Sequence, residues 1–226
     1  MTKENKIAAY VGKMIRDHFG KGPRSVYVTI APPYITMHLD DFLGPMESVL
    51  LGKNEQMTVF HIREKLMAKL LPEIKTYIFA VTDIEVKDFY YDWNLANKTG
   101  MFMGTVATNE ESKNVDQDFS KKDVLEQETI AVSEEVQKAP DNIYSAQVND
   151  RGFLVVREGI LVPIEKEMIS LGFVEDLKVA KRKLEKRKLH EARRFEKIFN
   201  KKIKDIFVDW ETNLDKSITT FLIDPK

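Results

Sequence analysis

An internal repeat constrains the fold of this chain more than any other feature of its sequence. The segment SVYVTIAPPYITMHLDDFLGPMESVLL (25–51) and the segment NIYSAQVNDRGFLVVREGILVPIEKEM (142–168) share one order of features. Each has an alternating apolar run, a break, a second alternating run and an L-x-P-x-E element. Alternation of this kind predicts a β-hairpin in each segment. The shared Pro45 and Pro163 are 118 residues apart.

A second pair of segments repeats at nearly the same distance. VKDFYYDW (86–93) matches IKDIFVDW (203–210), and these segments contain the two tryptophans of the chain. Trp93 and Trp210 are 117 residues apart. Two anchors with almost equal offsets argue against coincidence, so we predict two diverged copies of one domain of about 100 residues.

In the first copy, apolar residues at helical spacing predict an opening helix and a long later helix. The opening helix carries Ile7, Val11, Met14, Ile15 and Phe19, and the long helix carries Val59, Ile62, Leu66, Leu70 and Ile74. Between them we expect a hairpin broken at Pro32-Pro33 and a short helix starting near Pro45. Pro72 predicts a kink or a new helix start. Two strands, 84–91 and 101–106, close the copy.

The second copy repeats this order with a weaker opening helix. Its opening helix carries Leu125, Val132 and Val136, and its long helix carries Leu177, Ala180, Leu184, Phe195 and Ile198. The hairpin turns at 149–152, where Asn-Asp-Arg-Gly is favourable turn chemistry. Two strands, 203–208 and 218–223, close this copy too.

The order helix, hairpin, helices, hairpin predicts an α+β fold. We expect two tandem copies, each a mostly antiparallel four-stranded sheet with helices on one face. The first copy spans 1–108 and the second 124–226. The segment 109–123 between them is rich in polar and acidic residues, which predicts an exposed linker.

Composition limits the kinds of function. The net charge is −1, so the whole molecule has no field that would drive it onto nucleic acid or membrane. Cysteine is absent, which excludes disulfides, thiol catalysis and thiolate metal sites. No stretch approaches the ~20 apolar residues of a membrane span, and the start of the chain does not resemble a signal peptide. A cytoplasmic location is therefore expected, with peripheral attachment at the inner face of the membrane as an alternative.

A glycine-containing loop after the first helix is one candidate ligand site. Its Gly20, Lys21, Gly22 and Arg24 could surround an anion with backbone N–H groups and two cations. The favoured interpretation is structural, because a glycine C-cap followed by proline ends many helices. The second copy lacks these glycines, so an anion site here would occur once per chain.

Two residue pairs occur in both copies. Glu47 and Glu165 fall in the first turn of a predicted helix, where a carboxylate stabilises the helix dipole; the alternative is contact with a ligand or partner. Trp93 and Trp210 follow Asp at the predicted start of the last turn. They are expected to cover core or sheet edge, and a partner contact is the alternative.

The helix 178–194 is the most functional-looking surface feature, with nine Lys or Arg among 17 residues. It could bind phosphates, RNA or an anionic membrane, although a solvated face balanced by the acidic residues of 110–135 is favoured. The four histidines form no metal-ligand pattern, and no catalytic or cofactor-binding motif is present. We therefore predict no catalytic residues, no metal and no cofactor.

These motifs together resemble the MpsC-like domain, a family associated with a bacterial cation-translocating system that generates membrane potential. The matching residues are Phe19, Gly20, Gly22, Pro23, Leu43, Pro45, Glu47 and Arg63 in the first copy, and Leu161, Pro163, Glu165, Lys166 and Arg182 in the second. The first copy departs at Ser48, where a basic residue often follows the Glu. The second copy departs by losing the glycine loop.

The resemblance implies a soluble accessory protein near membrane subunits that couple cation movement to bicarbonate supply. Our first hypothesis is a non-enzymatic regulatory protein, and the alternative is an anion- or nucleic-acid-binding module that uses the helix 178–194. Enzymatic activity is less expected. Nucleic acid is also less expected as a partner. Further homodimerisation stays open. Candidate ligand residues are Gly20, Lys21, Gly22, Arg24, Glu47, Arg63, Glu165 and Arg182. Candidate partner residues are Trp93, Trp210, Lys181, Arg182, Arg187, Arg193 and Arg194.

Overall fold

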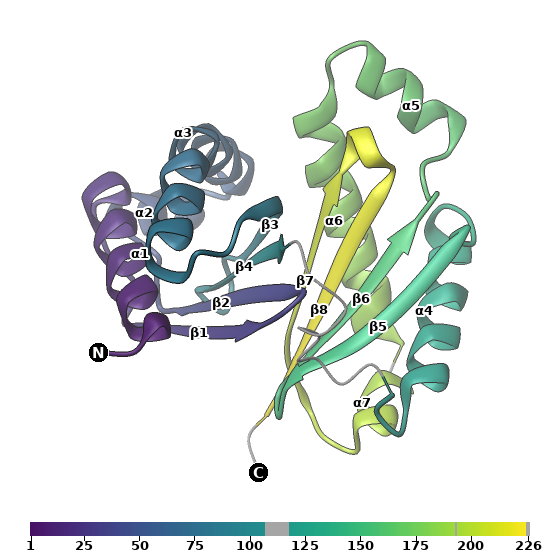
Figure 1. The fold of residues 1–226 in the computed structure, drawn as a ribbon. Helices are drawn as coiled ribbons and strands as arrows, with labels where there is room; N and C mark the ends of the chain where they lie inside the picture. Colours follow the sequence, from purple (N-terminus) through teal and green to yellow (C-terminus); the bar gives the residue numbers. More distant parts are fainter. Residues whose placement is uncertain (107–117, 193, 225–226) are drawn as a thin grey trace. The chain divides into compact units, whose positions relative to one another are not determined.

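The computed structural model describes residues 1–106, 118–192 and 194–224, and the chain divides into two compact units (Figure 1). Unit 1 spans 1–114 and unit 2 spans 115–226. Most of the predicted linker 109–123 lies outside the described residues, as does Arg193. Each unit has a hydrophobic core of its own.

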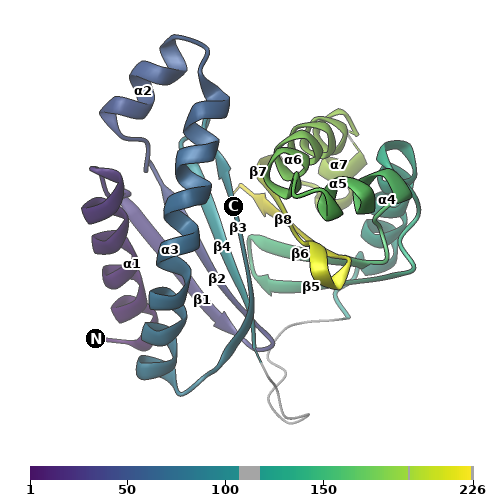
Figure 2. The ribbon, with the colours of Figure 1, turned by 90° about the horizontal axis from the view of Figure 1, so that it is seen from above.

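Unit 1 contains three helices and four strands in its described part. They are α1 (Lys3–Phe19), β1 (Ser25–Ala31), β2 (Tyr34–Asp40), α2 (Pro45–Gly52), α3 (Gln56–Thr82), β3 (Val86–Asn94) and β4 (Thr99–Val106). The strands form one antiparallel sheet in the order β1-β2-β4-β3. In Figure 2, α1 and α3 cover one face of this sheet, and α2 projects beyond its end.

Unit 2 repeats the arrangement. Its elements are α4 (Lys122–Val136), β5 (Asn142–Asn149), β6 (Gly152–Glu158), α5 (Pro163–Ser170), α6 (Val174–Glu191), α7 (Arg194–Phe199), β7 (Ile203–Glu211), the 3-10 turn η2 (Thr212–Leu214) and β8 (Lys216–Ile223). The sheet order is β5-β6-β8-β7, again antiparallel, with helices on one face. The predicted α+β fold with two tandem domains of like topology is thus confirmed.

The opening helix of unit 1 forms for local reasons. Thr2 caps it, because its hydroxyl accepts a hydrogen bond from the N–H of Asn5 at 3.2 Å. Its stripe of Ile7, Val11, Met14 and Ile15 is buried against the sheet, as the periodicity predicts.

Two observations bear on the predicted long helix of unit 1. It continues as one helix through Pro72, so no new helix starts there. Its buried row also runs through Arg63 and Met67, whereas the predicted Ile62 is 43% exposed. The helical break occurs instead in unit 2, between α6 and α7.

The last hairpin of each unit is longer than predicted. β3 continues to Asn94 and β7 to Glu211, so Trp93 and Trp210 lie within strands instead of at the turns. The two tryptophans occupy equivalent positions: Trp93 pairs with Gly100 on β4, and Trp210 pairs with Ser217 on β8. Gly100 and Ser217 are each the second residue of their strand.

Candidate functional site

A single carboxylate joins two helices in unit 1. Glu47 lies in the first turn of α2, and its Oε2 accepts a hydrogen bond from the N–H of Gly44 at 2.9 Å. Arg63 on α3 donates from Nη2 to the same oxygen at 2.8 Å, and its Nε lies 2.8 Å from Oε1. A carboxylate at a helix N-terminus is favoured by the helix dipole. Glu47 therefore stabilises the start of α2 and fixes it against α3.

Aromatic rings surround the guanidinium of Arg63. Its central carbon lies 3.9 Å from the ring centroid of Phe42, 4.2 Å from that of Trp93 and 4.6 Å from that of Phe19. The side chain is fully buried, and burial lowers the pKa of Arg63 to about 10, although Glu47 opposes this shift. Arg63 is still protonated at neutral pH. We call Phe19, Phe42, Glu47, Arg63 and Trp93 the Arg63 cluster.

Unit 2 has a counterpart with a lysine. Oε2 of Glu165 accepts from the N–H of Val162 at 3.0 Å at the start of α5, and Nζ of Lys181 on α6 lies 2.7 Å from Oε1. Lys181 also donates to the amide oxygen of Gln137 and lies 5.6 Å from the ring centroid of Trp210. Sixteen residues separate the acid from the cation in both units. Gln137, Glu165, Lys181 and Trp210 form the Lys181 cluster.

The predicted match of Arg182 to Arg63 is wrong by one residue. Arg182 donates from Nη2 to Oδ1 of Asp209 and from Nε to the carbonyl of Val208, both at 3.2 Å. One residue turns the side chain by about 100° around a helix, which directs Arg182 to β7 and Lys181 to Glu165. Arg182 and Lys181 are both buried, with Arg182 only 4% exposed, so neither is a surface cation.

The glycine loop ends α1. Gly20 has a φ of 78° and its N–H closes the last helical turn, as the C-cap interpretation predicts. A Cβ added to Gly22 would lie 2.9 Å from the carbonyl oxygen of Gly12, so this glycine permits close packing on α1. Both glycines therefore have structural reasons to be there.

The two cations of this loop have acidic partners. Nζ of Lys21 lies 3.3 Å from Oδ1 of Asp41, and Nε of Arg24 donates to Oδ2 of Asp40 at 3.0 Å. An anion bound in this loop would compete with both carboxylates for the same cations. The geometry favours the interpretation of this loop as the end of a helix over its interpretation as an anion-binding site.

A buried polar network in unit 2 escaped the sequence analysis. Arg157 on β6 donates to Glu185 at 2.5 Å, to the hydroxyl of Ser217 at 3.0 Å and to the hydroxyl of Ser133 at 3.3 Å. None of the four residues is more than 2% exposed. Arg157 shares a face of β6 with the core residue Val155, because side chains alternate along a strand. This alternation in the sequence could have indicated that Arg157 is buried. We call these four residues the Arg157 network.

Unit 1 has no polar residues at the matching positions. Leu39 pairs with Gly100 across the sheet as Arg157 pairs with Ser217. Met67 follows Arg63 by four residues, as Glu185 follows Lys181. The two units therefore share a topology, but the positions of Leu39 and Met67 in the core of unit 1 are taken by the ion pair Arg157–Glu185 in unit 2.

The candidate partner residues divide into buried and exposed ones. Trp93 is 1% and Trp210 2% exposed, which places both indoles in the cores. Arg187 is exposed, and the side chain of Arg194 is 75% exposed and 3.3 Å from Glu128. Among the candidates that the structure describes, only Arg187 and Arg194 lie at the surface.

The described residues contain no group of three or more His, Asp or Glu side chains that could hold a metal ion. None of the described helices is both long and apolar enough to span a bilayer. What the two clusters do chemically is to hold buried cations beside carboxylates, which fixes α2 and α5 in place.

Comparison with known families finds a match within unit 1. Residues 1–108 match the model of the family described as the Na+-translocating membrane potential-generating system (MpsC). No curated protein and no solved structure matches the chain. The segment that matches MpsC is therefore the one that contains the whole Arg63 cluster.

Proposed function

We propose that this protein is a non-enzymatic accessory or regulatory subunit that docks on a bacterial cation-translocating membrane system and supports its bicarbonate supply. The match of residues 1–108 to the MpsC family carries this proposal. Cytoplasmic location at the inner face of the membrane belongs to the same proposal.

The geometry of the shared motifs supports a role without catalysis. Glu47 and Arg63 are paired with each other in the core, and Lys21 and Arg24 are paired with acids. A catalytic carboxylate or cation has to face a substrate, whereas these groups face one another. In this proposal the motif residues maintain the fold, and other residues on the surface bind the partner.

We further propose that unit 2 is a diverged MpsC-like copy. Trp210 repeats Trp93 in its sheet position, and the pair Glu165–Lys181 repeats Glu47–Arg63 with the same spacing. Gln137 and Ile160 stand where Phe19 and Phe42 stand in unit 1, so the cation of unit 2, Lys181, keeps only the tryptophan among the aromatic neighbours of Arg63. This divergence gives the two units different cores on one topology.

The nucleic-acid alternative has less support. Lys178, Lys181 and Arg182 of the basic helix point to Asp209 or Glu165. Lys188 pairs with Glu135, and Arg194 pairs with Glu128. Much of the positive charge on this helix is thus neutralised within unit 2.

The proposal is tested by affinity purification of the tagged full chain from membranes of its own bacterium after chemical cross-linking. We expect subunits of an ion-translocating complex to be enriched over a tagged unrelated cytoplasmic protein. A deletion strain should grow poorly in air and recover at raised carbon dioxide. Recovery of no membrane protein together with normal growth of the deletion strain in air would overturn the proposal.

A further inference from the structure

Part of the cationic surface of unit 2 is left without acidic partners. Five side chains along α6, α7 and the turn before β7 are exposed or half-exposed and make no ion pair within the described residues. They are Lys183, Arg187, Lys197, Lys201 and Lys202. We call this set the basic strip. It is a local concentration of charge on a protein whose net charge is only −1.

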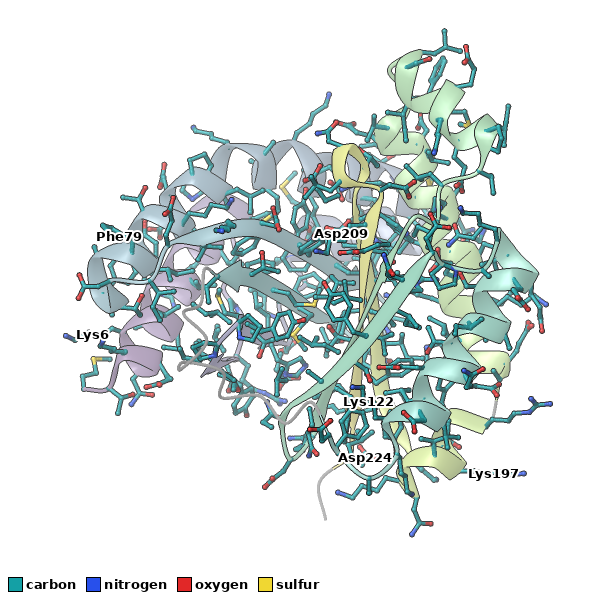
Figure 3. The ribbon with its side chains drawn as sticks, turned by 45° about the vertical axis from the view of Figure 1, so that its right-hand side comes forward. Lys6, Phe79, Lys122, Lys197, Asp209 and Asp224 are labelled. Carbon is teal, nitrogen blue, oxygen red and sulfur yellow. The ribbon has the colours of Figure 1, made fainter. Side chains whose placement is uncertain are left out.

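The helices direct the strip outward. Lys181, Glu185 and Leu189 form the buried row of α6, so Lys183 and Arg187, one turn apart, lie on its outer side. In Figure 3 the side chain of Lys197 points away from α7. The strip therefore faces away from the sheet, on the outside of the helical layer.

Acidic side chains border the strip on two sides. On the α4 side, Glu135 lies 3.2 Å from Lys188 and Glu128 lies 3.3 Å from Arg194. On the β7 side, Nζ of Lys186 lies over the ring of Phe207 at 5.4 Å, and the exposed Glu196 accepts a hydrogen bond from the N–H of Ile203 at 3.2 Å.

The chemistry of the strip fits phosphate groups presented on a surface. The neighbouring aromatic residues Phe195 and Phe199 pack into the core of unit 2. The described part of the strip thus has no exposed aromatic ring on which single-stranded bases could stack. Several lysine and arginine side chains on the outside of a helical layer suit the headgroups of anionic lipids, which attract each cation near the bilayer.

We propose that the basic strip holds unit 2 against an anionic lipid bilayer. The choice of lipid over other anionic surfaces rests on the proposed function, which places the protein beside a membrane system.

The test is sedimentation of the purified full chain with vesicles. One set contains phosphatidylcholine alone, and the other contains phosphatidylcholine and phosphatidylglycerol. The test variant is Lys183→Gln with Arg187→Gln, which removes two charges four residues apart on α6. The matched control is Lys65→Gln with Lys69→Gln, two exposed lysines with the same spacing on α3.

We expect binding only to vesicles with phosphatidylglycerol, and weaker binding at high salt. Each cation strengthens such binding about fivefold, so the test variant should bind roughly 25-fold more weakly. The control should bind like the original chain. Circular dichroism should be the same for all three.

Three results would overturn the proposal: no binding to phosphatidylglycerol at low salt, equal losses in the test and control variants, or preferential binding of single-stranded RNA over vesicles. Because this assay contains lipid and no membrane protein, its failure leaves the cross-linking result intact. Failure of the cross-linking experiment with retained lipid binding would reject the proposed function alone.

Discussion

The guanidinium carbon of Arg63 lies 4.2 Å from the ring centroid of Trp93, and the two side chains are among the largest fully buried ones in the protein. The cation is matched by the carboxylate of Glu47. A buried charge of this kind depends on its partner, because the partner offsets the cost of removing the charge from water.

Replacing Arg63 by Met should destabilise unit 1 by about 3–5 kcal/mol, because Glu47 would keep its buried position without its cation. Each unit contains one buried tryptophan, so Trp93 fluorescence in a Trp210→Phe background reports on unit 1 alone. Urea unfolding measures the change. Lys65→Met, at an exposed site on the same helix, is the control and should change the free energy by less than about 0.5 kcal/mol. Equal effects at both sites would contradict the role given to Arg63.

Unit 2 should tolerate the apolar residues of unit 1 at two positions of the Arg157 network. Glu185→Met alone should cost about 3–5 kcal/mol, because it leaves Arg157 buried and unpaired. Arg157→Leu together with Glu185→Met should be neutral or stabilising by about 1–4 kcal/mol. Unfolding followed by Trp210 fluorescence in a Trp93→Phe background measures both. Additive losses would show that the two side chains are not coupled.

Gly100 should not accept a side chain. A Cβ at this position would lie 2.6 Å from Cε3 of Trp93, so Gly100→Ala should cost about 1–3 kcal/mol through overpacking. Gly52→Ala is the comparison, because nothing lies within 4 Å of its added Cβ at the end of α2. That change should be neutral or stabilising by about 0.4–1 kcal/mol. Thermal unfolding in the Trp210→Phe background ranks the two, and a milder effect at Gly100 than at Gly52 would refute the packing argument.

His190 should make unit 2 less stable on acidification. Neighbouring atoms shield part of the His190 imidazole from water, and this partial desolvation lowers its pKa below the usual value, against the opposing effect of Asp205. Just below the unfolded pKa of about 6.5, the unfolded chain binds a proton that the folded chain does not. The free energy of unfolding therefore falls as the pH drops through this range. Urea unfolding at about pH 7.5 and about pH 5.5 should show a smaller decrease for His190→Gln than for the original chain, and an unchanged decrease would exclude this residue as a cause.

The sequence predicted the topology well because the repeat and the strand alternation are local patterns. Both hairpins of each unit form where these patterns place them, although the long helix predicted for unit 2 is divided into α6 and α7. The ends of β3 and β7 were missed because Trp93 and Trp210 continue the alternation beyond the Asp that was taken for a turn residue.

The sites were harder to predict, for one physical reason. The buried rows of α3 and α6 run through Arg63 in unit 1 and through Lys181 and Glu185 in unit 2. A search for apolar periodicity does not count charged residues, so it assigned Ile62 and Ala180 to the buried rows instead. The same shift led to Arg182 being matched in place of Lys181. Ion pairs inside a core are set by tertiary contacts, which periodicity does not reveal.

The buried ion pair of unit 2 also bears on how the two units avoid exchanging equivalent segments during folding. Proteins with two similar domains can exchange equivalent segments as they fold. With β6 in the place of β2, Arg157 would sit opposite Gly100 and find Met67 where Glu185 should be. The reverse exchange would leave Glu185 facing Leu39. Either exchange would leave a buried charge without its partner. The difference between the two cores therefore disfavours pairing of a strand with the wrong unit.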